Sequence, residues 1–464
     1  MAFQLISKKV AVIGGGAAGL VAARELKKEG HDVVVFERQA QLGGTWVYSP
    51  EVESDPLGLD PTRKIVHSSL YTSLRTNLPR EAMGFRDFPF VPSGKPDRDS
   101  RRFPAHWEVL RYLEDFCREF GLNELIRYQT EVRHVSLGID GMWMVKYRIG
   151  GDESSNVDET FDAVVICTGH FTEPRIADNI PGIEHWPGRQ IHSHNYRVPD
   201  PYQEQVVVLI GNASSALDIS RDIAGFAKEV HIACKNEATG RYGKHPVYDN
   251  MWLHPVIERA YEDGRLSFQD GSVVHADVIL HCTGYKYHFP FLDIDSVVNV
   301  DDNRVGPLYK HVFRPTLAPG ISFIGIPSVV LAFFLYELQS KWVAGVLSGR
   351  ILLPSDEKMM KDIEAFYSEL DAKEVPKRYT HKIHDFKRLF RPFEYEDWLA
   401  AECGSPPAEE WRKNMFFATV VRAFRQMETF RDEWDDEDLV LQAHKDFMQY
   451  LSADGRVITT ASTT

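Results

Sequence analysis

Cysteine is scarce in this 464-residue sequence. There are five cysteines, and no two of them have the CxxC spacing. The sequence therefore argues against a disulfide scaffold, a zinc ribbon and a dithiol redox enzyme. Its 18 histidines show neither an HExxH nor a CxxC…HxxxH spacing, so we predict no metal site.

Long hydrophobic runs and a positive net charge are also lacking. The longest fully apolar run, 329–336, has about eight residues, whereas roughly 20 are needed to cross a bilayer. The 53 Lys and Arg residues against 67 Asp and Glu residues give a net charge of −14, which argues against nucleic acid or an anionic membrane surface as partner. The N-terminus is not typical of a signal peptide. We expect a reduced, cytoplasmic protein.

A glycine-rich turn lies near the N-terminus. The apolar segments 9–14 and 32–36 are typical of buried strands, and 20–29 between them has helical periodicity. The turn consists of Gly14, Gly15, Gly16, Ala17, Ala18 and Gly19. This GxGxxG pattern between a strand and a helix, followed by an acid at Glu37, predicts a dinucleotide site.

Each part of this pattern has a physical task. Gly14 allows the tight turn, Gly16 lets the backbone approach a pyrophosphate, and Gly19 lets helix and strand pack closely. The pyrophosphate would lie at the helix N-terminus, where free N–H groups and the helix dipole favour negative charge. Glu37 would accept hydrogen bonds from the ribose hydroxyls.

A second unit of the same kind begins near residue 205. Segments 205–210 and 230–233 are predicted strands, and 217–227 is a predicted helix. The turn consists of Gly211, Asn212, Ala213, Ser214, Ser215 and Ala216. It reads GxAxxA, which favours a nucleotide site over a plain strand-to-helix turn, although Ala213 should push the backbone slightly off the phosphate.

Lys235 follows the second predicted strand of this unit, where the first unit has Glu37. A lysine would pair with a 2′-phosphate that a carboxylate would repel, so we predict NADP(H) at this site. The alternative is that Lys235 is a solvated surface charge. One protein with two dinucleotide sites usually moves a hydride between them. The N-terminal unit suits FAD and the second suits NADPH, which predicts a flavoprotein oxidoreductase.

Two later segments resemble each other, FDAVVICTG at 161–169 and ADVILHCTG at 276–284. Each is an apolar strand that ends in Cys-Thr-Gly and comes late in its unit. We expect both cysteines to be structural, because neither has a partner and each lies where a strand ends. The candidate cofactor residues in these segments are Thr168, Gly169, Thr283 and Gly284.

The repeat predicts an α/β fold with two Rossmann-like dinucleotide-binding domains, the NADPH domain inserted into the FAD domain. We expect the first part of the FAD domain at 1–178, the NADPH domain at 179–287, and the rest of the FAD domain at 288–464. Segment 320–327 should return as a strand to the first domain. The acidic run 430–438 is interpreted as a solvated surface.

Four further motifs resemble those of flavin-containing monooxygenases. Residues 186–196 (WPGRQIHSHNY) are similar to the family's FxGxxxHxxx(F/Y) identifying motif, with Trp186 in place of the usual Phe. Residues 42–46 resemble its second glycine motif near FAD, and 73–79 (SLRTNLP) its flavin-facing loop. Residues 282–285 (CTGY) resemble its ATGY linker.

The resemblance implies a specific chemistry. Stretches 77–85 and 192–201 are similar to the plant sulfur-oxygenating branch, which includes glucosinolate S-oxygenases and S-alkenylcysteine S-oxygenases. NADPH would reduce FAD, and O2 would add to give a C4a-hydroperoxyflavin. A small thioether, of methylthioalkyl glucosinolate or S-alk(en)yl cysteine type, would then be oxidised to a sulfoxide. N-oxygenation and an auxin-type oxidative decarboxylation use the same cofactors and stay open, as does a flavin-bearing sensor without turnover.

Site residues also follow from the resemblance. Asn77 would hydrogen-bond near the reacting edge of the flavin as a positioning group, the alternative being an ordinary turn asparagine. His192 and Tyr196 would support the orientation of the NADPH domain, and Val132 would meet the adenine through its backbone. The other implied cofactor residues are Leu42, Gly44, Thr45, Trp46 and Thr76.

Two residues depart from the family's pattern. Ala213 replaces a glycine of the nucleotide loop, and Lys235 stands where many relatives have an arginine. Because lysine cannot form a bidentate contact with a phosphate, we expect weaker selectivity for NADPH. The C-terminal membrane anchor of the animal enzymes has no counterpart here, so no membrane anchor is expected. The predicted partners are a thioether and O2, and the predicted state is a monomer or homodimer.

Overall fold

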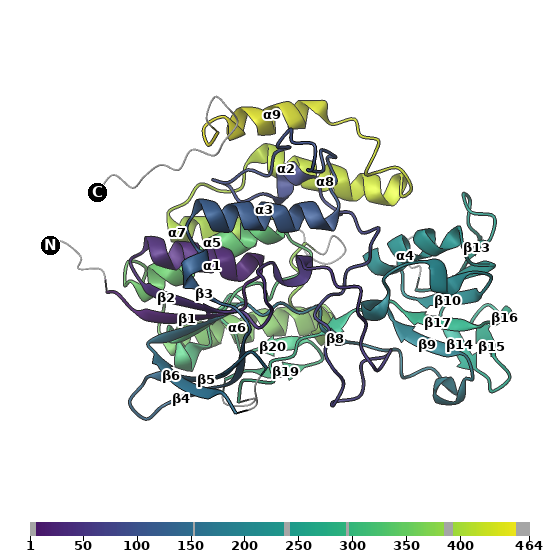
Figure 1. Ribbon diagram of the computed structural model, residues 1–464, viewed down its shortest axis with the longest axis horizontal. Coiled ribbons are helices and arrows are strands. Elements are labelled where there is room, and N and C mark those ends of the chain that lie inside the picture. Colours follow the sequence, from purple (N-terminus) through teal and green to yellow (C-terminus); the bar gives the residue numbers. More distant parts are fainter. Residues whose placement is uncertain (1–5, 152–153, 236–241, 294–296, 385–392, 452–464) are drawn as a thin grey trace. The chain divides into compact units, whose positions relative to one another are not determined.

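The chain folds into two compact units, drawn in Figure 1. This computed structural model describes residues 6–151, 154–235, 242–293, 297–384 and 393–451. The first unit comprises Met1–Trp46, Thr76–Gly169 and Tyr287–Thr464, and the second comprises Val47–Arg75 and His170–Lys286. The second unit is therefore inserted in the first. The predicted fold class, α/β with one dinucleotide-binding domain inserted into another, is confirmed.

Two segments belong to a different unit from the one predicted. The predicted boundaries put 47–75 and 170–178 in the FAD domain, whereas the structure places both in the second unit. The first difference arises because the buried Arg197 donates to three backbone carbonyls within 47–75. The second arises because β8 (Glu173–Pro174) pairs with β18 (Tyr285–Lys286).

A parallel five-stranded sheet lies at the centre of the first unit. Its order is β21 (Ile321–Phe323), β7 (Ala163–Ile166), β1 (Lys9–Ile13), β2 (Asp32–Phe36) and β3 (Ile126–Arg127). The strands are short runs of mostly buried apolar residues, as expected where helices and other strands cover both faces. Since β21 pairs with β7, the predicted return of segment 320–327 to the first domain is confirmed.

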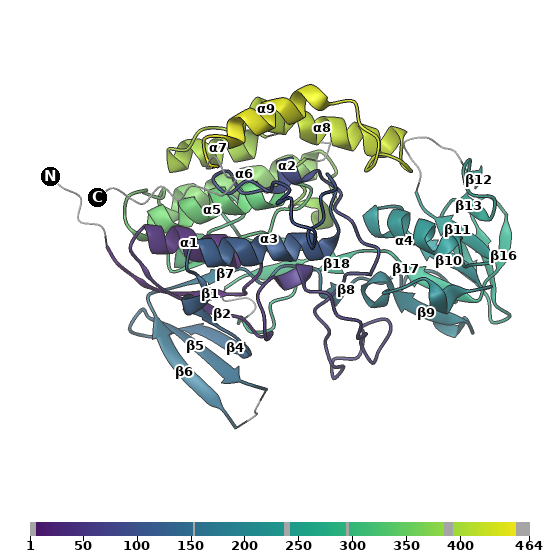
Figure 2. The same cartoon turned by 45° about the horizontal axis from the view of Figure 1, so that its top comes forward.

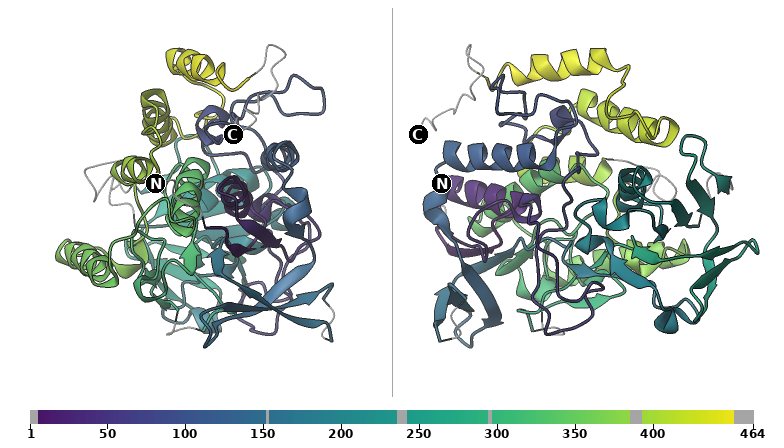
Figure 3. Two further views of the ribbon diagram at one scale, coloured as in Figure 1. Left: turned by 90° about the vertical axis from the view of Figure 1, so that its left-hand side faces the viewer. Right: turned by 45° about the vertical axis from the view of Figure 1, so that its right-hand side comes forward.

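The helices of this unit lie mainly on one side of the sheet, with α8 and α9 further from it than α1, as Figures 1 and 2 show. They are α1 (Ala17–Lys28), α2 (Arg80–Met83), α3 (His106–Glu119), α5 (Ala332–Leu347), α6 (Asp356–Ala372), α7 (Glu394–Cys403), α8 (Glu410–Arg425) and α9 (Glu437–Phe447). Helix α5 contacts α1 and α7, and its Phe333 and Phe334 are buried in the core. Figure 3 shows α8 and α9 next to each other, and they are in contact.

Smaller antiparallel sheets complete the first unit. Their strands are β4 (Thr130–Leu137), β5 (Trp143–Ile149) and β6 (Asn156–Phe161) in one sheet, and β19 (Asn299–Asp301) and β20 (Arg304–Gly306) in another. Strand β4 has a register shift between Val132 and His134, so the regular ladder with β5 is interrupted there.

The second unit repeats the plan of the first. Its main sheet has the order β12 (Gly243–Lys244), β13 (Met251–His254), β11 (Glu229–Ala233), β10 (Val206–Ile210), β17 (Val278–His281) and β9 (Arg189–His192). All pairs are parallel except that of the edge strand β12. Helix α4 (Ser214–Ala224) follows β10. A three-stranded sheet contains β14 (Ile257–Ala260), β15 (Arg265–Phe268) and β16 (Val273–His275).

In the ranges that the structure describes, the helices are too short or too polar to cross a membrane. The same residues contain no group of His, Cys, Asp and Glu side chains arranged to hold a metal ion. The cytoplasmic location and the monomeric or dimeric state stay predictions.

Candidate functional site

The first glycine turn is shaped by the strand that runs beside it. The amide of Gly14 donates to the carbonyl of Phe36 at 2.9 Å, and Gly14 has a φ of +107°. A Cβ at Gly14 would lie 2.5 Å from the carbonyl oxygen of Cys167, and one at Gly19 would lie 1.8 Å from the oxygen of Gly14. Only glycine fits these two positions, because both side chains would meet backbone atoms.

The second glycine motif near FAD, residues 42–46, packs against this first turn. The amide of Gly43 donates to the carbonyl of Gly15 at 3.0 Å, and a Cβ at Gly16 would lie 3.4 Å from the Cα of Gly44. Helix α1 begins here with Gly16 as its N-cap, and it has neither a side-chain cap nor an acid in its first turn. The structure thus brings two predicted FAD motifs together at a helix N-terminus that suits a pyrophosphate.

Glu37 is bound to the glycine turn itself. Its Oε2 accepts from the amide of Gly15 at 2.8 Å, and its Oε1 accepts from the amide of Gln39 at 2.7 Å. Burial raises the pKa of Glu37, while these backbone bonds oppose the shift. A carboxylate has about four lone pairs, so both oxygens keep acceptor capacity for ribose hydroxyls. Sequence spacing predicts the acid but not its bond to the turn.

The other candidate residues of the first unit lie just after a strand or where the pairing of β4 with β5 is interrupted. Thr168 and Gly169 follow β7 and are exposed. Val132 is half-buried in β4, at the register shift. Backbone next to such a bulge is released from regular pairing, which favours the predicted contact of Val132 with adenine through its backbone.

The second glycine turn has the same geometry as the first. Gly211 has a φ of +117°, its amide donates to the carbonyl of Ala233 at 2.9 Å, and a Cβ there would lie 2.5 Å from the oxygen of Cys282. The two Cys-Thr-Gly segments therefore have the same task, in agreement with structural cysteines. Helix α4 lacks a side-chain cap and a first-turn acid, and Asn212, Ala213 and Ser214 at its start are exposed. Lys235 is exposed two residues beyond β11.

The identifying motif forms the interior of the second unit. His192 is fully buried; its Nδ1 accepts from the amide of His194 at 3.0 Å, so its Nε2 carries the hydrogen and donates to the carbonyl of Gly284 at 3.0 Å. Burial lowers the pKa of His192 to about 3, which keeps the ring neutral. Tyr196, also buried, donates to Asp222 on α4 at 2.5 Å. These contacts support a structural task for His192 and Tyr196.

Two further candidate residues, Thr283 and Gly284, make hydrogen bonds inside the second unit. The hydroxyl of Thr283 donates to the carbonyl of Arg175, and the carbonyl of Gly284 accepts from the amide of Arg175 at 2.9 Å. Arg197, which the sequence reasoning missed although it follows the motif directly, also donates to the carbonyls of His194 and Tyr196.

Asn77 lies in a loop that is held at several points. Its side chain is exposed, and its Oδ1 accepts from Nη2 of Arg431 at 2.5 Å. Nε of Arg431 also donates to the carbonyl of Thr76 at 2.9 Å. Thr76 in turn donates through its hydroxyl to the carbonyl of Leu78 at 2.8 Å, and through its amide to the carbonyl of Pro104 at 2.9 Å.

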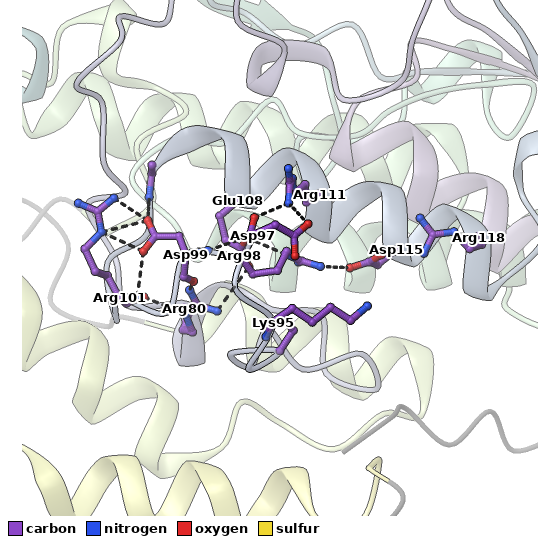
Figure 4. A network of polar contacts seen from close by, with 12 residues as sticks. Arg80, Lys95, Asp97, Arg98, Asp99, Arg101, Glu108, Arg111, Asp115 and Arg118 are labelled. Atoms are coloured by element: carbon purple, nitrogen blue, oxygen red, sulfur yellow. Dashed lines mark hydrogen bonds and ion pairs between the residues drawn. The ribbon is translucent and has the colours of Figure 1, made fainter. Parts of the chain in front are cut away.

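A buried polar network supports the same loop (Figure 4). The guanidinium of Arg80, only 1% exposed, donates to the carbonyls of Asp99 and Arg101. Figure 4 shows Asp99 facing the side chain of Arg101. Nε of Arg98 donates to Oε2 of Glu108 at 2.8 Å. Hydrogen bonds therefore hold residues 76–80 in place, and the side chains that make them belong to the same network.

The interpretation of 430–438 as a solvated surface was wrong in part. Phe430 and Asp436 are buried, and Arg102 makes two hydrogen bonds to the carboxylate of Asp436, at 2.5 and 3.0 Å. Phe430 also packs edge-on against Phe103, with ring centroids 5.7 Å apart. Asp435 and Asp436 pair with the buried Arg422, whereas 432–434, 437 and 438 are exposed. One residue of the run, Arg431, contacts Asn77.

Comparisons with known proteins identify the family. The flavin-binding monooxygenase-like family model matches residues 7–242 and 247–389. Two Arabidopsis thaliana relatives are similar over nearly the whole length. One is the flavin-containing monooxygenase FMO GS-OX-like 4, with 57% identity over 96% of this chain and 98% of its own. The other is FMO GS-OX4, with 58% identity over 95% of this chain and 94% of its own.

A solved structure agrees. S-allyl-L-cysteine S-oxygenase from Allium sativum is 54% identical, with a TM-score of 0.92 over 96% of this chain and 100% of its own. The predicted resemblance to the plant S-oxygenating branch, the flavin cofactor and the oxidoreductase activity are thereby confirmed, and FAD with NADPH fits them. This protein belongs to the flavin-binding monooxygenase-like family.

Proposed function

We propose that this protein uses NADPH, FAD and O2 to oxidise the sulfur of a small thioether to a sulfoxide, with a methylthioalkyl glucosinolate or an S-alk(en)yl cysteine as the substrate type. The observation that carries the choice of sulfur is the similarity, at 54% identity and a TM-score of 0.92, to S-allyl-L-cysteine S-oxygenase, alongside 58% identity to FMO GS-OX4. The overall reaction consumes NADPH, a proton, O2 and the thioether, and yields NADP+, water and the sulfoxide.

The first unit would bind FAD. The uncapped N-terminus of α1 would hold the pyrophosphate, Glu37 the ribose, and the backbone at Val132 the adenine. When bound, FAD would pass electrons from NADPH to O2 and so activate the oxygen, by the hydroperoxyflavin route that the family resemblance implies. The protein's own task at the flavin is positioning, and Asn77 is our candidate for it. Further contacts are assigned to Leu42, Gly44, Thr45, Trp46, Thr76, Thr168 and Gly169.

The second unit would bind NADPH. The start of α4 is exposed and uncapped, so its amides suit the pyrophosphate, and Lys235 would pair with the 2′-phosphate. We assign a structural task within this unit to four residues: Thr283, Gly284, His192 and Tyr196.

A panel of thioethers with NADPH or NADH tests the proposal. We expect one sulfoxide per NADPH consumed, and slower turnover with NADH. NADPH oxidation that yields only H2O2 across both substrate types would contradict sulfur as the target. An N-oxide from an amine, or a decarboxylated product from a 2-oxo acid, formed at higher kcat/KM than any sulfoxide would favour the alternative activities.

A further inference from the structure

Arg431 lies outside the residues matched by the family model, yet it contacts the candidate catalytic loop. Two of its nitrogens are engaged there, Nη2 with Oδ1 of Asn77 and Nε with the carbonyl of Thr76. A guanidinium has only donors. The side-chain atom of Asn77 that faces Arg431 must therefore be the oxygen, which fixes the orientation of the amide.

The arginine is itself held in place. Its guanidinium lies over the ring of Phe430, with 4.8 Å between its central carbon and the ring centroid. Phe430 is 6% exposed and packs on Phe103. A few residues further on, Asp436 makes two hydrogen bonds to Arg102. The segment that carries Arg431 is thus anchored on both sides of it.

We propose that Arg431 is the positioning residue of Asn77, and that it makes Asn77 a hydrogen-bond donor to the bound flavin and its oxygen. With Oδ1 turned toward the guanidinium, the Nδ2 hydrogens lie on the other side of the amide and are the groups that it presents away from Arg431. A donor stabilises the negative charge that develops on oxygen as it is activated. The inference rests on the proposed function, because it presupposes that Asn77 works at the flavin.

The test compares sulfoxide formed per NADPH consumed in the FAD-loaded enzyme. In Arg431→Met we expect this ratio to fall about 10-fold, with a matching rise in H2O2, because a charge-assisted hydrogen bond is lost. FAD content should not change. Arg431→Lys should recover part of the ratio, since an ammonium can donate to Oδ1 but does not reproduce the fork. Arg425→Met is the matched control: Arg425 is exposed at the end of α8, and its ratio should equal the wild type.

The variant Asn77→Asp separates the contact with Arg431 from hydrogen-bond donation by the side-chain amide. A carboxylate keeps the acceptor for Arg431 but has no amide hydrogens, so we expect it to be as uncoupled as Asn77→Ala. The double variant Asn77→Ala/Arg431→Met should be no worse than Asn77→Ala alone, because Arg431 acts through Asn77.

The outcomes are distinguishable. A wild-type ratio in Arg431→Met, or multiplied losses in the double variant, would overturn the role of Arg431 while leaving the proposed function intact. A wild-type ratio in Asn77→Asp would overturn the assignment of Asn77 as a donor. A wild-type ratio in Asn77→Ala would show instead that the role proposed for Asn77 at the flavin is wrong.

Discussion

The two glycine turns share a backbone and differ in what surrounds them. Gly14 and Gly211 both have left-handed φ values and approach a cysteine carbonyl equally closely. The first turn, however, is bonded to Glu37 and covered by Gly44, whereas the residues after Gly211 are exposed. This difference supports our proposal that the first turn binds a cofactor that stays bound, and the second a dinucleotide that enters and leaves on each turnover.

Gly19 and Ala216 occupy the same place in the two turns and should respond most differently. In Gly19→Ala the new Cβ would collide with the oxygen of Gly14, so we expect a loss of about 4 kcal/mol or more and no retained FAD. Ala216→Gly should cost only about 1 kcal/mol, from helix propensity. Flavin absorbance after gel filtration and thermal unfolding measure both. A Gly19→Ala protein with full FAD would remove this distinction.

Gly14→Ala and Gly211→Ala form a matched pair, because the strain is the same in each. Both should destabilise their own unit by about 3 kcal/mol. Gly14→Ala should lose FAD, whereas Gly211→Ala should keep FAD and raise the KM for NADPH at least about 10-fold. FAD content and NADPH kinetics are the measurements. If both variants lose FAD, the two turns do not bind different cofactors.

The neutral His192 makes the second unit sensitive to acid. Its pKa is lowered from 6.5 to about 3 by burial, so the unfolded chain binds a proton that the folded chain rejects. Its contribution to stability is complete above pH 6.5 and is lost as the pH falls toward 3, by up to about 1.4 kcal/mol per pH unit. Urea unfolding at pH 7 and pH 5 should show a smaller drop in His192→Gln than in the wild type. Equal drops would contradict this assignment.

Lys235 should give the smallest effect. Lys235→Ala is expected to raise the KM for NADPH about 10-fold and to leave that for NADH unchanged, because only NADPH carries the 2′-phosphate. Lys235→Arg should improve the preference for NADPH about threefold. Lys228→Ala, an exposed lysine of the same unit, is the control. Equal changes with both nucleotides would place Lys235 outside the phosphate site.

The sequence predicts best what is local. The glycine turns could be identified because the strand, the turn and the helix that define them are consecutive in the chain. Contacts between distant residues could not be predicted, since no spacing relates Arg431 to Asn77, 354 residues earlier. For the same reason the run 430–438 looked like a solvated surface, although its Asp436 pairs with Arg102. The domain boundary near segment 47–75 could not be predicted either, because the hydrogen bonds of Arg197 join this segment to the second unit.

The most direct test of the account is the product stoichiometry of gel-filtered enzyme assayed with NADPH, O2 and an S-alkenyl cysteine, with no FAD added. Tight binding at the first turn and exchange at the second predict one sulfoxide per NADPH without any FAD in the buffer. Activity that depends on added FAD, or NADPH oxidation without sulfoxide, would contradict it.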